Sequence, residues 1–212
     1  MSLDTPPRWS RRRAALAVIV VLALAGGAVG ALWSVLAPPA RGVIALTRGG
    51  DRIHAYLGAE ADNLFTAAFI LWGMLTVLAV VAAVWVWQWR AHRGPVLVAA
   101  LATGCAAAAG VAGAVGTVLV RWRYGTIDID AAPVSPERRV HYVTEAPAAF
   151  FGSSPLQIAV SVLFPAAIAA MVYALTAVST SRDDLGAWPP MDSAAAIGRI
   201  ETTGDAQPVA PS

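Results

Sequence analysis

The sequence predicts an all-α integral membrane protein, with four transmembrane helices and a small β-rich extracytoplasmic cap formed by two loops. Of its 212 residues, 58% are hydrophobic, and its mean hydropathy is +0.63. Four apolar runs without a charged residue are each long enough to span a bilayer, which takes about 20 residues of helix. They cover residues 14–37, 64–89, 96–120 and 156–178. Between them, short alternations of apolar and polar residues indicate strands.

The four runs define one transmembrane domain over residues 14–178. The other segments are a cytoplasmic N-terminal arm (1–13), two external loops (38–63 and 121–155) and a mostly disordered cytoplasmic tail (179–212). The first run is longer than the apolar core of a cleaved signal peptide, which has about 7–15 residues. Two prolines directly follow its end, so we expect an uncleaved anchor.

Arginine positions favour a plasma-membrane protein with both termini in the cytoplasm. One cluster lies at residues 8–13, before the first run, and the short link WRAHRGP at 89–95 carries two more arginines. Arginine is enriched in cytoplasmic flanks, so the cluster and the link mark the inner side, although the external loops carry a similar number. Acidic residues of the loops balance their arginines, and this neutral outer surface argues against nucleic acid as a partner.

Small residues in two of the runs predict close helix packing. Gly26 and Gly30 are four residues apart in the first run, and Gly110 and Gly113 lie in the alanine-rich third run. Small side chains let helix backbones approach closely in lipid. We expect these glycines at contacts within the bundle, or at a contact with another membrane protein or a second copy of the chain.

The tryptophans are expected at the two membrane surfaces, where indole rings are enriched. This interpretation covers Trp85, Trp87 and Trp89 at the cytoplasmic end of the second run, together with Trp9, Trp33 and Trp122. The composition therefore implies the lipid bilayer as a further partner of the chain.

Three segments of the loops predict strands of a small antiparallel sheet. Residues 42–46 and 52–57 are rich in apolar side chains and flank RGGD, a good hairpin turn. Residues 127–130 and 139–144 alternate in character as well. An isolated hairpin is marginal in stability, so we expect the two loops to pair or to rest on the membrane.

The histidines and the glutamate of this cap allow two interpretations, a polar functional site or ordinary solvated loop residues. His141 and Glu145 would share one face of a strand, and His54 lies in the other loop, so these side chains could hold a metal or act as an acid/base pair. No catalytic or metal-binding motif accompanies them, and solvated loop residues in local hydrogen bonds explain them better. The sequence thus assigns no catalytic residue, no metal ligand and no cofactor. The single cysteine, Cys105, excludes an intramolecular disulfide.

Aromatic residues near the fourth run are candidate partner contacts. The stretch RRVHYVTEAPAAFFG, at 138–152, contains Tyr142, Phe150 and Phe151. The two phenylalanines are interpreted as a wedge at the bilayer edge that leads into the fourth helix. The alternative is that another protein's helix docks against them.

Several segments together resemble an actinobacterial family of membrane proteins of unknown function, including mycobacterial members. They are ALTRGGDRIHAYLGAEADNLF, WQWRAHRGP, RYGTIDID and HYVTEAPAAFFG. The resemblance covers Trp33 to Val178. It implies an actinobacterial plasma-membrane protein and brings no activity, cofactor or catalytic residue.

The predicted function is that of a non-enzymatic accessory or scaffold subunit, which binds another cell-envelope protein. None of the four runs contains Asp, Glu, Arg or His, which ion pathways and proton relays need. The alternative is a lipid-handling or metal-dependent enzyme that acts at the outer leaflet through the external loops.

Overall fold

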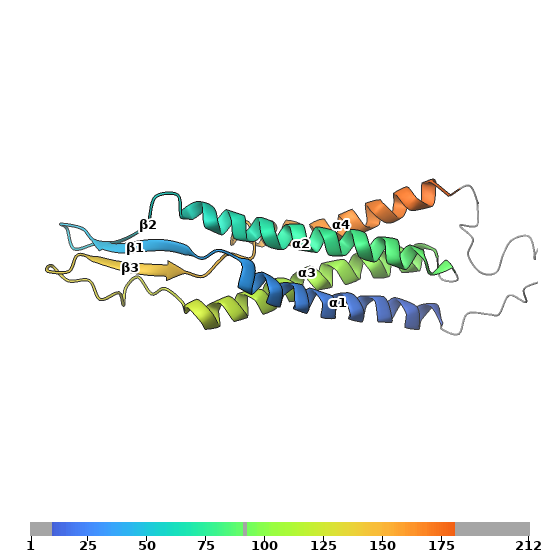
Figure 1. The fold of residues 1–212 in the computed structure, drawn as a ribbon, viewed down its shortest axis with the longest axis horizontal. Coiled ribbons are helices and arrows are strands. Elements are labelled where there is room, and N and C mark those ends of the chain that lie inside the picture. Colours follow the sequence, from blue (N-terminus) through green and yellow to red (C-terminus); the bar gives the residue numbers. More distant parts are fainter. Residues whose placement is uncertain (1–9, 91–92, 181–212) are drawn as a thin grey trace, which may run out of the picture.

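The computed structural model describes residues 10–90 and 93–180, which form a bundle of long helices with a sheet at one end (Figure 1). The elements in chain order are α1 (Arg11–Leu36), β1 (Ala40–Leu46), β2 (Arg52–Tyr56), α2 (Ala61–Trp87), α3 (Pro95–Tyr124), β3 (Val140–Glu145) and α4 (Pro155–Val178). We call the end of the bundle that carries the strands the sheet end, and the opposite end, where α2 turns into α3, the turn end. Most of the predicted N-terminal arm and of the tail lies outside the described residues.

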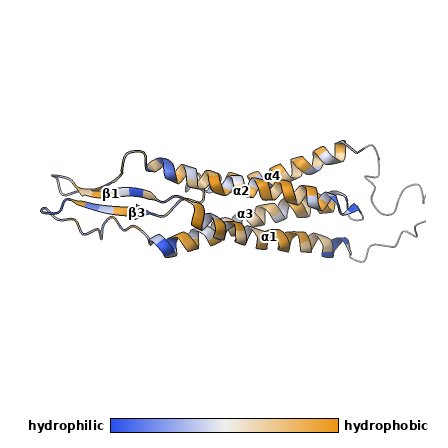
Figure 2. Ribbon diagram, in the orientation of Figure 1, coloured by the Kyte–Doolittle hydropathy of each residue, from blue (hydrophilic) through white to orange (hydrophobic). Residues whose placement is uncertain are grey.

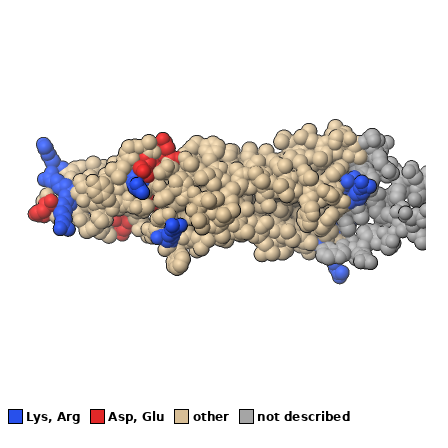
Figure 3. Space-filling model, viewed as in Figure 1, with Lys and Arg blue, Asp and Glu red and all other residues tan. Residues whose placement is uncertain are grey.

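All four helices are long and apolar enough to cross a membrane. Apolar residues follow the middle of each helix, and the face in Figure 3 carries charged side chains only toward the two ends (Figures 2 and 3). The predicted set of four candidate membrane helices is confirmed, although each helix begins before its apolar run. For example, α1 begins at Arg11, because the Ser10 hydroxyl caps it by accepting a hydrogen bond from the Arg13 N–H at 3.3 Å.

Helices α1 and α3 meet along a seam of small residues. Gly26 lies directly on the backbone of Ala108, and Gly30 lies on that of Ala112 one turn further along. A Cβ atom at Gly26 would stand 2.6 Å from the Ala108 Cα atom, so only glycine fits there. A Cβ atom at Gly110, by contrast, would meet nothing within 4 Å. The close contact expected at Gly110 is therefore not found within the described chain.

Trp33 is buried inside the bundle, and its predicted place at a membrane surface is wrong. Its side chain is 0% exposed, and its ring lies on Gly116 of α3, where a Cβ atom would be 2.6 Å from the Trp33 Cε3 atom. The indole Nε1–H donates a hydrogen bond of 2.7 Å to the carbonyl of Ala67 on α2. Trp33 thus joins three helices, because one small residue makes room for the ring and one carbonyl satisfies its N–H.

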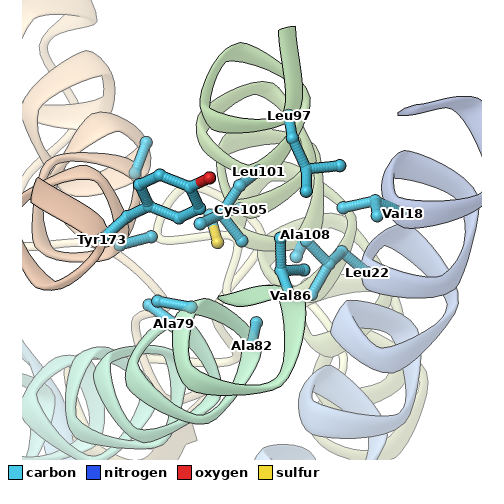
Figure 4. Close-up of a cluster of buried hydrophobic side chains, with 13 residues drawn as sticks. Val18, Leu22, Ala79, Ala82, Val86, Leu97, Leu101, Cys105, Ala108 and Tyr173 are labelled. Atoms are coloured by element: carbon cyan, nitrogen blue, oxygen red, sulfur yellow. The ribbon is translucent and has the colours of Figure 1, made fainter. Parts of the chain in front are cut away.

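The turn end is held by aromatic and aliphatic contacts between all four helices. In Figure 4, Cys105 of α3 lies beside Tyr173 of α4, and Val18 and Leu22 of α1 lie on the opposite side of the cluster. The Tyr173 hydroxyl accepts a hydrogen bond from the Gly94 N–H at 3.3 Å. The Arg93 guanidinium lies 4.1 Å from the centre of the Trp87 ring, and its Nε–H donates to the Trp87 carbonyl at 2.9 Å. The link between α2 and α3 is therefore fixed to α4 and to the end of α2.

The sheet combines both loops. Its strand order is β2-β1-β3, and β1 pairs antiparallel with both neighbours. The predicted hairpin turn is present: Gly50 has φ +91°, and the Thr47 hydroxyl accepts a hydrogen bond from the Asp51 N–H at 3.0 Å. The small β-rich cap is thus confirmed as a three-stranded sheet in the described part of the chain.

The strand expected at residues 127–130 is wrong. The Asp128 carboxylate accepts hydrogen bonds from the N–H groups of Asp130, at 3.0 Å, and Ala131, at 3.1 Å. An aspartate that bonds the backbone ahead of it closes a turn. The alternation of isoleucine and aspartate therefore belongs to a turn between α3 and β3.

Candidate functional site

The two faces of the sheet differ in exposure. On the inner face, Ile44 of β1 pairs with His54 of β2 and with His141 of β3, and Ile44 is 1% exposed. The other face carries apolar side chains that solvent reaches. We call it the outer sheet face, made of Val43, Ala45, Ile53, Ala55, Val140 and Tyr142.

On the inner face, Tyr56 and Glu145 form the main polar contact. Burial, followed by a hydrogen bond to Glu145 and its charge, raises the pKa of Tyr56 to about 12. The Tyr56 hydroxyl lies near the Glu145 carboxylate, whose Oε2 atom has no hydrogen-bond partner within the described residues. The His54 ring meets the Tyr56 ring edge-on at 4.9 Å. These contacts fix the polar groups in place at the base of the sheet.

The candidate polar residues share the inner face without forming one cluster. His54 and His141 lie on opposite sides of the central strand, and Ile44 stands between them. Within residues 10–90 and 93–180, no group of three or more His, Cys, Asp or Glu side chains could hold a metal ion. The structure thus brings His54, His141 and Glu145 to one face, and an acid/base or metal site there stays a prediction.

Of the three candidate aromatic contacts, Tyr142 is the one that extends into solvent. It is 71% exposed and lies on the outer sheet face next to Val140, which is across β1 from Ile53. Val140 is 50% and Ile53 55% exposed. Sequence reasoning singled out Tyr142 but not the other two, although the same alternation of residues places Val140 beside Tyr142.

Phe150 and Phe151 pack against the helices of their own chain. The Phe150 ring lies on Gly113 of α3. The Phe151 ring meets Phe65, Phe69 and Trp72 of α2 edge-on, with ring centres 5.0–5.2 Å apart. Both side chains are half-buried. They anchor the segment before α4, and their predicted contact with a partner stays untested.

The loop arginines are not spread evenly, although loop charges balance overall. Many of them gather at the far end of the sheet (Figure 3). We call this group the arginine tip, made of Arg48, Arg52, Arg138 and Arg139, all exposed. The acidic residues beside it are Asp51 and Glu137, and the Ser135 hydroxyl donates to the Glu137 carboxylate at 2.8 Å. The distal end of the sheet therefore carries excess positive charge.

Comparison with known proteins finds relatives over most of the chain. The family model for a protein of unknown function (DUF2567) matches residues 22–187. The uncharacterized protein Rv1591 of Mycobacterium tuberculosis is 51% identical over 172 residues, which are 81% of this chain and 89% of that protein. The uncharacterized protein ML1222 of Mycobacterium leprae is 48% identical over 184 residues, 87% of this chain and 91% of that protein. No solved structure matches.

Proposed function

Since this chain belongs to the DUF2567 family of proteins of unknown function, we propose its role from its own geometry. It is a multi-pass plasma-membrane protein, and its outer sheet face docks another protein of the cell envelope. It acts as an accessory or scaffold subunit. The observation that carries this role is the exposed apolar surface of the outer sheet face.

The membrane explains the exposed apolar residues of the helices but not those of the sheet. Leu24 of α1 and Val77 of α2, for example, are 71% and 63% exposed, as expected for side chains that face lipid. The strands extend beyond the helices along the long axis of the molecule (Figure 1). A bilayer around the helices therefore leaves Tyr142, Ile53 and Val140 uncovered. Exposed apolar patches outside lipid are typical of interaction surfaces.

Arginine positions support a cytoplasmic turn end and an external sheet. Arg11, Arg12 and Arg13 begin α1, and Arg90 and Arg93 lie in the link between α2 and α3, all at the turn end. Arginines in short flanks and links favour the cytoplasm. The sheet then lies outside, and another envelope protein can reach its outer face.

The occupant of the outer sheet face is a separate protein with an apolar surface bordered by carboxylates. The described chain begins at Ser10 and ends at Thr180, both at the turn end and opposite the sheet. The arginine tip lies at the distal edge of the same sheet. Opposite charges around an apolar centre favour encounter and fix orientation, so carboxylates on the partner would complement this tip.

Site-specific photo-crosslinking tests this role. The photoreactive residue p-benzoylphenylalanine replaces Tyr142, Ile53 or Val140, one at a time, in the full chain within actinobacterial membranes. All three positions should give the same heavier adduct with one other envelope protein. Mass spectrometry should map the linked peptide to an apolar segment flanked by acidic residues.

The matched control is the same replacement at Trp122, an aromatic residue of α3 that is 88% exposed but lies off the sheet. It should not give this adduct. An adduct with a second copy of this chain would mean that the outer sheet face forms a homo-oligomer instead of binding another protein. The docking role is wrong if the three sheet positions give no adduct, or if Trp122 gives the same one.

A further inference from the structure

A cavity of about 780 Å³ opens at the sheet end of the bundle, apart from the outer sheet face. Its walls come from the first turn of α2, the last turns of α3, the residues that follow α3, and the segment between β3 and α4. The residues that matter here are Leu64, Thr117, Val120, Arg121, Thr126 and Phe150. The cavity lies where the helices end, which is the headgroup level of a bilayer that surrounds them.

The polar groups of this cavity have no partners in the part of the chain that the structure describes. Arg121 is exposed and makes no ion pair there. The hydroxyl groups of Thr117 and Thr126 make no hydrogen bond with the described residues either. Across residues 148–153, no main-chain N–H donates to another described residue. One guanidinium and several N–H and O–H donors thus line one space, together with one carboxylate, that of Glu145.

Apart from Glu145 and Ser153, the rest of the wall is apolar, and it is closed toward the membrane centre. Leu64 and Val120 line it from α2 and α3. The Phe150 ring lies on Gly113, one helical turn deeper in α3 than Thr117, so it closes the cavity on that side. A site with donors near the helix ends and aliphatic walls beside them suits an amphiphile that carries an anionic group.

We propose that this cavity binds the phosphate of a membrane phospholipid. The Arg121 guanidinium pairs with the phosphate oxygens, because a planar guanidinium matches them with two parallel N–H donors. The hydroxyl groups and the free main-chain N–H groups supply further hydrogen bonds. The glycerol and the start of an acyl chain lie along Leu64 and Val120. This site is independent of the outer sheet face and of any partner bound there.

Lipid binding to the purified full-length protein tests the site. The protein is held in dodecylmaltoside, and dihexanoylphosphatidylglycerol is titrated, with binding followed by native mass spectrometry. Arg121→Gln should weaken binding about tenfold or more, as expected for the loss of charge-assisted hydrogen bonds. Thr117→Phe, which fills the cavity from α3, should weaken it similarly. Each variant should keep its melting temperature in the absence of added lipid.

Arg123→Gln is the matched control, because Arg123 has the same charge two residues away and lines a different surface, beside Ser34 and Trp122. It should change binding less than about twofold, as a rim charge does. Equal loss in Arg121→Gln and Arg123→Gln, or no loss in either cavity variant, overturns the site. If inorganic phosphate alone stabilises the wild-type protein as much as the lipid does, the occupant is the free anion and the lipid assignment is wrong.

Discussion

The ring of Phe150 occupies the space that a side chain at position 113 would take. A Cβ atom on Gly113 would be 3.0 Å from the Phe150 Cε2 atom and closer still to its Cζ atom. This contact attaches the segment before α4 to the middle of α3, and it also closes the cavity that Arg121 lines. The missing side chain at position 113 therefore leaves room for the segment that leads into α4.

Gly113→Ala should destabilise the protein by about 1–3 kcal/mol, because the added methyl group meets an aromatic ring in a packed contact. Phe150→Leu shortens the opposing side chain, so the double variant should recover part of this loss. A thermal-unfolding double-mutant cycle in detergent measures the coupling. Gly110→Ala, one turn away in open space, is the control and should be neutral. Additive losses in the cycle would contradict direct contact.

Gly26→Ala should destabilise the protein strongly, since its Cβ atom would overlap the Ala108 backbone. Backbone cannot move aside as a flexible side chain does, so we expect a loss of about 2 kcal/mol or more. Gly27→Ala is the neighbouring control, because its Cβ atom would only touch the Val111 side chain at 3.7 Å. The melting temperatures of Gly26→Ala and Gly27→Ala are compared in one detergent. Equal values would mean that α1 and α3 are not in close contact.

Trp33→Phe removes the hydrogen bond to the Ala67 carbonyl and leaves a gap beside Gly116. A buried hydrogen bond and a partly empty indole site together should cost about 2–4 kcal/mol. Trp122→Phe, at an 88% exposed position, should change stability by less than about 0.5 kcal/mol. Chemical or thermal unfolding in detergent compares the stability of the two variants. A neutral Trp33→Phe would argue against its buried position between the three helices.

The raised pKa of Tyr56 predicts that the sheet weakens at alkaline pH. Its value rises from 10.0 to about 12, chiefly through burial and then through the Glu145 carboxylate. A group whose folded pKa is raised contributes stability that is complete below the unfolded pKa and is lost as pH passes the folded one. The contribution of Tyr56 is therefore full below pH 10 and disappears through pH 12.

Tyrosinate absorbance during an alkaline titration checks this. Tyr56→Phe should remove the most alkaline step, and Glu145→Gln should lower the pKa of Tyr56 only in part, because burial is the larger cause. Tyr142→Phe is the control, since that ring is 71% exposed. If the most alkaline step persists in Tyr56→Phe, the assignment fails.

Labelling of single cysteines on the two sides of the membrane tests the proposed orientation. Single cysteines replace Ser135, at the sheet end, and Gly186, in the C-terminal segment, in a Cys105→Ala background. A membrane-impermeant maleimide added to intact cells should label the first position only, because the proposed topology places the sheet outside and the C-terminus inside. Labelling at Gly186 but not at Ser135 would reverse the orientation.

Hydrophobic runs and turn chemistry predict most of the fold. The four helices follow from their apolar length, and the β1–β2 hairpin follows from the RGGD turn between two apolar stretches. The alternation around Tyr142 predicts β3. The same reasoning fails at residues 127–130, because four alternating residues satisfy a strand and an aspartate-closed turn equally well, and only hydrogen bonding decides between them.

Contacts between helices are much harder to predict, because they depend on which side of a helix faces a neighbour. Gly110 and Gly113 are equally small, yet only Gly113 lies against another side chain. Trp33 has the same sequence signature as a membrane-surface tryptophan until Gly116 and the Ala67 carbonyl are placed beside it. The outer sheet face was missed in part for a similar reason, since it joins residues from both loops.

The central position of β1 links membrane insertion to completion of the sheet. In chain order β1 and β2 come first, and a two-stranded hairpin has little stability by itself. The third strand arrives only after α2 and α3 have been inserted, and it can pair with β1 only if both loops emerge on the same side. A chain whose α2–α3 hairpin fails to insert leaves one edge of β1 unpaired and its backbone donors free. In the proposed topology, a complete sheet therefore requires both loops to lie on the same side of the membrane.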